Sequence, residues 1–182
     1  MSGDATKTSL WTDADVRVDW TMAALAPTDG KTAYAAAWGL VGLLDGSSGI
    51  EEVRDEDNAE HFAWGGVLIK KVRSKHKRTI KFVALENNDD VFKLLNPGST
   101  RGTAVAGVST DIVKLPKYVD FSISFEVREG TAARRRTVKR ATIEEIGTIK
   151  ANEDDPAMYE ITVVIYPEAD GTLYRDVYGP SV

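Results

Sequence analysis

The chain has 182 residues, no cysteine and a formal net charge of −5, and 42% of its residues are hydrophobic. This length and composition are typical of one globular domain with a real core. Without cysteine the chain cannot form disulfides, thiol nucleophiles or zinc–thiolate sites. The sequence has no apolar run long enough to span a bilayer, and its first residues lack the basic and apolar regions of a secretory signal. We therefore expect a single domain over residues 1–182 that is made and used without export.

The charge is unevenly distributed along the chain. Residues 1–66 carry a net charge of −8, residues 67–149 carry +8 and residues 150–182 carry −5. A basic centre between acidic ends indicates either a nucleic-acid patch or copies that attract one another through opposite charges.

The N-terminal third begins with residues 1–36, which we interpret as an N-terminal arm that includes the first strand. Residues 15–20 alternate between polar and apolar types and predict that strand. Residues 38–44 read as a buried strand ending at an Asp-Gly turn. Residues 46–60 are acidic, and Gly and Ser open the segment, so we expect a long surface loop. Such loops are often functional or ordered by a partner, although a plain solvated loop is the open alternative.

The middle of the chain predicts a hairpin and one well-defined strand. Residues 62–72 and 79–85 read as strands on either side of a basic tip at residues 73–78. Residues 119–128 alternate strictly, which predicts Val119, Phe121, Ile123, Phe125 and Val127 on the core face and polar side chains on the other.

Between these strands lies a short predicted helix over residues 88–95. Asn88 is a good N-cap, and Asp89 and Asp90 suit the positive end of the helix dipole. Asn96 before Pro97 ends the helix. A helix of about two turns cannot stand alone in water. We therefore expect it to be held against the sheet through its apolar side chains, which are Val91, Phe92, Leu94 and Leu95.

The C-terminal part adds strands at residues 134–150, 158–166 and 172–178, the last two separated by an Asp-Gly turn. In total the pattern predicts about eight strands joined mostly by turns, with very little helix. The expected fold class is mainly β, an antiparallel sandwich or half-barrel with one short packed helix.

A search for catalytic or metal-binding residues finds no recognisable site. No nucleophile, phosphate-binding or zinc-protease motif occurs, and the two histidines, His61 and His76, lack converging ligands. The carboxylate pairs are adjacent in sequence, so on strands they point to opposite faces. We expect no catalytic, cofactor-binding or metal-binding residue, and therefore no enzyme.

Two basic segments, residues 70–81 and 134–140, together hold twelve Lys and Arg side chains. They could follow phosphates, but they are not interleaved with stacking aromatics, and the whole chain is acidic. Solvated or subunit-facing strand faces are the favoured interpretation.

The order of these elements carries a family resemblance. A strand from Trp38-Gly39 ends at Asp45-Gly46 before the acidic loop, and Ala63-Trp64-Gly65-Gly66 follows. Then Leu85-Glu86-Asn87-Asn88 leads into the helix, and residues 136–167 continue the order. This ordered set, over roughly residues 10–178, resembles the tail tube (major tail) proteins of phages with long, non-contractile tails.

The resemblance implies the tail tube protein fold and a structural role. Subunits of this kind form hexameric rings that stack into a tube, and DNA passes through the lumen without sequence-specific binding. The implied partners are other copies of the chain, the tape measure protein, the tail terminator and the distal tail protein, with no membrane. The implied location is the virion tail tube, assembled in the cytoplasm of the host.

The charge segregation then suggests how copies would meet. An acidic loop at residues 46–60 could contact a basic strand face on the next ring, and residues 1–36 could order on assembly. The candidate inter-subunit residues are Glu51, Glu52, Asp55, Glu56, Asp57, Lys75, Lys77, Arg78, Arg134, Arg135 and Arg136.

Two other readings remain open at this point. Another virion protein on the same fold would be a tail terminator, a head–tail adaptor or a decoration protein. A β-sandwich hydrolase with a dispersed site is the enzymatic alternative, and the missing motifs argue against it.

Overall fold

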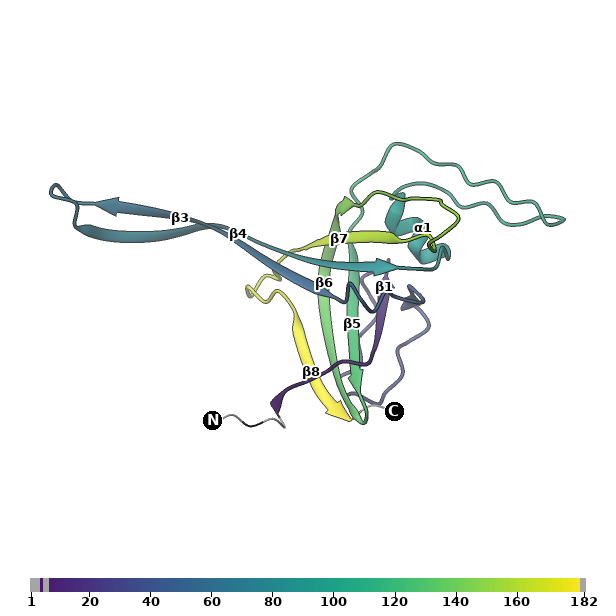
Figure 1. Ribbon diagram of the computed structural model, residues 1–182, viewed down its shortest axis with the longest axis horizontal. Helices are drawn as coiled ribbons and strands as arrows, with labels where there is room; N and C mark the ends of the chain where they lie inside the picture. The colour runs from purple at the N-terminus through teal and green to yellow at the C-terminus, as the bar shows by residue number, and fades with distance from the viewer. Residues whose placement is uncertain (1–3, 5–6, 181–182) are drawn as a thin grey trace.

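Eight strands and one α-helix make up the described part of the computed structural model, which comprises residue 4 and residues 7–180 (Figure 1). In chain order they are β1 (Asp13–Asp19), β2 (Gly39–Leu40), β3 (Glu51–Phe62), β4 (Leu68–Ala84), α1 (Asp89–Leu95), β5 (Phe121–Glu129), β6 (Ala132–Ile146), β7 (Tyr159–Ile165) and β8 (Arg175–Pro180). The strands form an antiparallel sheet in the order β2-β1-β5-β6-β7-β4-β3, with β8 paired to β6 beside this path. The predicted class, mainly antiparallel β with one short helix, is confirmed.

Strand β6 has two partners along one edge, and the sheet divides there. Residues 132–137 pair with β8 and residues 141–146 pair with β7, while β5 pairs along the other edge. The sheet then curls back on itself. Phe82 of β4 meets Phe125 of β5 edge to face with ring centroids 5.8 Å apart, although β6 and β7 lie between these strands in the sheet. The curl makes a half-barrel that encloses the core.

The core residues come from five strands (β1, β4, β5, β6 and β7), from the helix and from the segment after β2. They are Val16, Val18, Val41, Ile80, Phe82, Ala84, Val91, Leu94, Phe121, Ile123, Phe125, Val138, Ala141, Ile161, Val163 and Ile165. The alternation read in residues 119–128 is confirmed for Phe121, Ile123 and Phe125, which point inward.

The opposite face of β5 differs from the prediction, because it is also buried. Ser122, Ser124 and Glu126 are each at most 3% exposed. Residues 20–38 cross over this face, and the Tyr34 hydroxyl lies 2.8 Å from the Ser124 hydroxyl. The N-terminal segment therefore covers a face that alternation alone assigns to solvent.

Helix α1 forms as its sequence predicts. The Asn88 side chain accepts hydrogen bonds from the backbone N–H groups of Asp90 and Val91, and Asn96 N–H donates to Phe92 O at the other end. Val91, Phe92 and Leu94 are buried, and Leu95 is half-buried. The Asn88 amide also donates to Val41 O at 2.8 Å. One side chain thus caps the helix and ties it to the segment after β2.

The predicted acidic loop at residues 46–60 is wrong beyond residue 50, and the predicted basic tip at residues 73–78 is wrong. Residues 51–62 form β3, and β4 runs without interruption through the basic stretch from residue 68 to residue 84. The tip is the turn Ala63–Val67, where Gly65 and Gly66 adopt φ angles of +92° and +81°. The reason is cross-strand charge pairing: acidic β3 lies opposite basic β4, a match between segments that reading each alone does not reveal.

Candidate inter-subunit surfaces

The β3–β4 hairpin divides into a root and an outer half. At the root, residues 79–84 of β4 also pair with β7 and reach the core. Beyond the root the two strands pair only with each other, and the ribbon projects from the body (Figure 1). Almost every side chain of this outer half is exposed. Because an isolated two-stranded ribbon is at best marginally stable in water, this segment is suited to being covered by another surface.

Ion pairs run across the outer half. Lys75 lies 2.9 Å from Asp57, and Lys71 lies 3.2 Å from Glu60. Glu56 is reached by the imidazole of His76 at 2.9 Å. These exposed pairs set the register of the ribbon but contribute only about 0.2–1 kcal/mol each. The acidic candidates on β3 and the basic candidates on β4, which we expected on two different copies, therefore lie opposite each other in one chain.

At the root, Glu52 is the centre of a second cluster. Its carboxylate accepts hydrogen bonds from Arg78 and Arg136, and Arg136 also donates to Asp176 of β8. The Arg136 guanidinium lies 3.9 Å from the centre of the Tyr174 ring. Burial favours the neutral acid, but the hydrogen bond and charge of Arg136 outweigh it and lower the pKa of Glu52. The cluster holds the hairpin root against β6 and β8.

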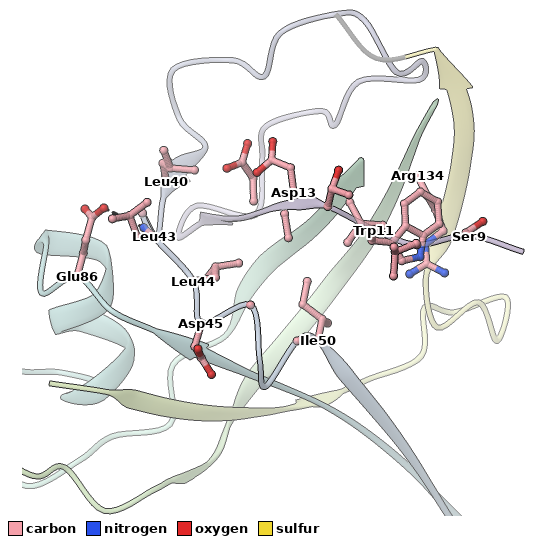
Figure 2. Close-up of a pocket in the computed structure, with 18 residues that line it drawn as sticks. Ser9, Trp11, Asp13, Leu40, Leu43, Leu44, Asp45, Ile50, Glu86 and Arg134 are labelled. Atoms are coloured by element: carbon pink, nitrogen blue, oxygen red, sulfur yellow. Dashed lines mark hydrogen bonds between the residues drawn. The ribbon is translucent and has the colours of Figure 1, made fainter. Parts of the chain in front are cut away.

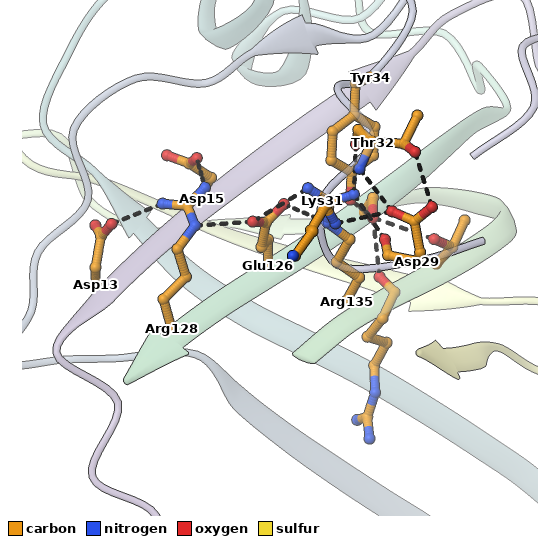
Figure 3. Close-up of polar contacts among 12 residues, drawn as sticks. Asp13, Asp15, Asp29, Lys31, Thr32, Tyr34, Glu126, Arg128 and Arg135 are labelled. Carbon is orange, nitrogen blue, oxygen red and sulfur yellow. Dashed lines mark hydrogen bonds and ion pairs between the residues drawn. The ribbon is translucent and has the colours of Figure 1, made fainter. Parts of the chain in front are cut away.

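A third polar cluster fixes the N-terminal segment (Figure 3). Arg135 donates from Nε to Glu126 at 2.8 Å, and from Nη1 to the backbone carbonyls of Asp29 and Thr32. Arg128 reaches Asp13 and Glu126. Arg135 is only 4% exposed, so its charged group serves the fold of its own chain. Sequence reasoning missed Glu126, because it occupies a polar position of an alternating strand and carries no other signal.

The remaining predicted inter-subunit residues lie near the root of the hairpin and on β6. Glu51 lies opposite Lys81 and Asp55 opposite Lys77, both near the root. The Lys77 ammonium lies 2.5 Å from Glu144 of β6, and that hydrogen bond raises the pKa of Lys77. The Arg134 guanidinium lies 5.3 Å from the centre of the Trp11 ring. These residues join elements of the monomer, and their contact with a neighbouring copy stays a prediction.

The tip of the hairpin is apolar and uncovered. Trp64 is fully exposed (103%), and Phe62, Val67, Leu68 and Ile69 around it are also exposed. A large apolar group on the end of a thin ribbon marks an interaction surface. The motif Ala63-Trp64-Gly65-Gly66 is one part of the family resemblance in the sequence. In the structure its glycines make the turn and its tryptophan is exposed.

A second projection comes from the long connection between α1 and β5 (Figure 1). Two isolated bridges, Thr100 with Ile112 and Val105 with Val108, hold it as an irregular loop. Its exposed apolar side chains are Val105, Val108, Ile112, Val113, Leu115 and Tyr118. This loop is a further candidate for contact with another chain.

The body carries a groove of about 590 Å³ between the N-terminal segment and residues 40–50. Figure 2 shows Leu43, Leu44 and Ile50 along one side and Trp11 with Arg134 toward the other end. Its lining includes four carboxylates, Asp13, Asp15, Asp45 and Glu86, and the cation Arg134. Arg128 forms ion pairs with Asp13 and Asp15. Among the described residues, Asp45 and Glu86 pair with no cation, so these two acids give the groove its excess negative charge. Hydrogen bonds from the side chains of Ser48 and Ser47 lower the pKa of Asp45 to about 2, so this acid is charged at neutral pH. The groove is both apolar and negative.

No group of three or more potential metal ligands occurs within the described residues, and no helix among them has the length and apolar character to cross a membrane. The features that stand out are thus surfaces: a ribbon with an apolar tip, a projecting loop and an acidic apolar groove.

A family model described as phage tail tube protein matches residues 17–177. The chain belongs to the phage tail tube protein family. No match was found among curated proteins. The family assignment agrees with the resemblance read from the order of elements in the sequence.

One solved structure similar to this tail tube family member is a sheath/tube terminator of an extracellular contractile injection system (PVC), determined by cryo-EM in the extended state. The two share 11% sequence identity with a TM-score of 0.54, over 96% of this chain and 99% of that chain. At this identity the likeness concerns the fold. The family match supports a structural component of a phage tail.

Proposed function

We propose that this chain is the subunit of the tail tube itself, in a phage with a long, non-contractile tail. Copies would form hexameric rings that stack into a hollow tube in the virion, after assembly in the cytoplasm of the host. DNA would pass through the lumen during ejection without sequence-specific binding. The tape measure protein, the tail terminator and the distal tail protein would be its partners. The chain would perform no catalysis.

The observation that carries this proposal is the outer half of the β3–β4 hairpin. It projects from the body with an apolar tip, and no core of its own chain supports it (Figure 1). A subunit of a continuous assembly can bury such a ribbon on a neighbouring copy, which offsets the cost of exposing Trp64 and Ile69. The net charge of −5 also suits a conduit that must release DNA phosphates rather than hold them.

The direct test is negative-stain microscopy of the concentrated protein, where we expect long hollow tubes. Trp64→Ser combined with Ile69→Ser should abolish the tubes and leave a folded monomer by circular dichroism. Leu25→Ser is the matched control, because Leu25 is 87% exposed on a different part of the surface. Normal tubes from the tip variant would contradict the role of the hairpin, and a wild-type protein that stays monomeric at high concentration would contradict the tube.

The second candidate is a tail terminator, which the fold of the sheath/tube terminator favours. A terminator caps a tube, so it would form closed rings that do not lengthen with concentration. Rings alone in the same micrographs would select this alternative.

A further inference from the structure

The apolar tip and the acidic groove are complementary in chemistry. The tip offers Trp64 and aliphatic side chains, and Lys70 stands beside them on β4. In the part of the chain that the structure describes, Lys70 forms no ion pair. The groove offers Leu43, Leu44 and Ile50 together with the acids Asp45 and Glu86, which no cation among the described residues pairs, against the single arginine Arg134 in its lining. An apolar plug with an unpaired cation fits an apolar slot with excess negative charge.

The tip and the groove of one chain cannot meet. Ile50 lines the groove and is the residue before β3, so the hairpin starts at the groove and runs away from it. Twelve extended residues of β3, from Glu51 to Phe62, separate the two. At a rise of about 3.3 Å per residue this is a distance of about 40 Å. Any contact between tip and groove must therefore join different copies.

We infer that the tip of the β3–β4 hairpin of one copy, centred on Trp64, seats in the groove between residues 9–15 and 40–50 of the next copy. This inference rests on the proposed function and specifies which surfaces join successive copies. The contact is heterologous, since each copy uses a tip on one side and a groove on the other, and such contacts repeat without closing when the operation is a translation. The length of the hairpin then limits the spacing of successive copies along its direction to about 40 Å.

A smaller apolar pocket near the long loop is the competing receptor. It has a volume of about 350 Å³ and is lined by Leu95, Tyr118 and Ile143, with Glu144, Glu145 and Lys117. Lys117 offsets one of its acids, and Glu144 already pairs with Lys77 of the hairpin root. The first groove is larger and carries the greater excess of negative charge, so it fits the cationic tip better.

The test uses cysteine pairs on separate copies, which is clean because the chain has no native cysteine. One copy carries Val67→Cys at the tip, which leaves Trp64 in place. The other carries Gly46→Cys, since a Cβ at Gly46 meets nothing within 4 Å and the residue lines the groove. The two variants are mixed, allowed to assemble and oxidised, and a dimer band is sought on a non-reducing gel. One of the two copies carries a tag that changes its mass, so the gel separates the mixed dimer from both homodimers. Because each copy has a single cysteine, a mixed dimer reports contact between copies.

Two matched mixtures serve as controls. Val67→Cys with Val113→Cys samples the exposed long loop, and Val67→Cys with Glu145→Cys samples the competing pocket. We expect the mixed dimer with Gly46→Cys, its loss when Trp64→Ser is added to the tip copy, and no mixed dimer in either control. Its absence with Gly46→Cys from samples that contain tubes would overturn the inference while leaving the proposed function standing. A mixed dimer with Glu145→Cys would overturn it in favour of the smaller pocket. If no tubes and no dimers form, both the inference and the proposed function fail.

Discussion

The two halves of strand β4 have the same partner, β3, but opposite surroundings. Its inner residues, 79–84, also pair with β7 and bury Ile80 and Phe82 in the core. Its outer residues, 68–77, pair with no second strand in the described part of the chain and are almost all exposed. Stability of the monomer and contact with other chains are therefore assigned to different halves of the same strand. Burial makes the inner half a source of monomer stability, whereas the outer half displays groups for other chains, so changes there should affect assembly and not folding.

The largest expected effect in the body comes from the buried pair of Glu126 and Arg135. Glu126→Ala leaves the Arg135 guanidinium buried without its carboxylate, and we expect a loss of about 3–5 kcal/mol in the free energy of unfolding. Urea denaturation measures it, with Glu129→Ala as the control, because Glu129 is half-buried at the end of the same strand and accepts a hydrogen bond from the backbone N–H of Leu10. A loss below about 1 kcal/mol would show that water reaches this arginine after all.

Next in size is the packing of the helix. Leu94 is fully buried, so Leu94→Ala should lower the free energy of unfolding by about 2–5 kcal/mol. Leu115→Ala, on the exposed long loop, provides the matched comparison and should leave the unfolding midpoint unchanged. If the Leu94 variant loses less than about 0.5 kcal/mol, the helix is not part of the core as the structure places it.

The cap of the helix should matter less than its packing. Asn88→Ala removes the acceptor for two backbone N–H groups and the donor to Val41 O, and we expect a loss of about 0.5–2 kcal/mol. Asn88→Asp restores the acceptor but not the donor, so thermal unfolding of the two variants separates the capping contribution from the tie to residue 41. Equal losses would mean that the tie, and not the cap, carries the effect.

Acid should weaken the body through carboxylates whose folded pKa is depressed. In Asp19 burial favours the neutral form, but hydrogen bonds from Thr21 and Ala24 outweigh it and lower the pKa below 3.8, and Arg136 lowers that of Glu52 below 4.5. The stability that such groups provide is present above their unfolded pKa values and is lost as the pH falls through the lower folded values. Unfolding midpoints should therefore decline below pH 4.5. Glu52→Gln should flatten part of that decline, and an unchanged slope would remove Glu52 from this account.

The smallest effect on stability is expected in the outer hairpin. Asp57→Ala breaks the exposed pair with Lys75, which should change the free energy of unfolding by less than about 1 kcal/mol. The same variant can be tested for tube formation by microscopy. If this variant unfolded the body, the outer half of the hairpin would contribute to monomer stability, which contradicts the distinction drawn between the two halves of β4.

Local signals in the sequence were sufficient for some elements. The helix was predicted with its cap and its buried face, because Asn88, the aspartates after it and Pro97 act within one or two turns of chain. The core face of β5 was also predicted, since strict alternation of Phe121, Ile123 and Phe125 depends only on strand geometry. The mainly β class followed from the number of such strands.

Other features depended on segments that lie far apart in the sequence. Residues 51–60 were predicted as part of a loop because acidic residues disfavour a strand on their own. They form a strand because they pair with basic residues of β4. The polar face of β5 looked solvated because nothing in its sequence reveals that residues 20–38 fold over it. The three arginines at 134–136 looked alike, yet Arg135 is buried against Glu126 and Arg136 holds the hairpin root.

The sequence by itself determined the class of fold, the single helix and the family, because each depends on local pattern or on the order of elements. Only the tertiary structure decided which charged side chains form ion pairs within the chain and which surfaces remain exposed to other copies. The physical reason is that pairing and burial are set by what lies opposite a residue in space. The hairpin places Trp64 far from the acidic groove of its own chain, and this separation is visible only in the tertiary structure.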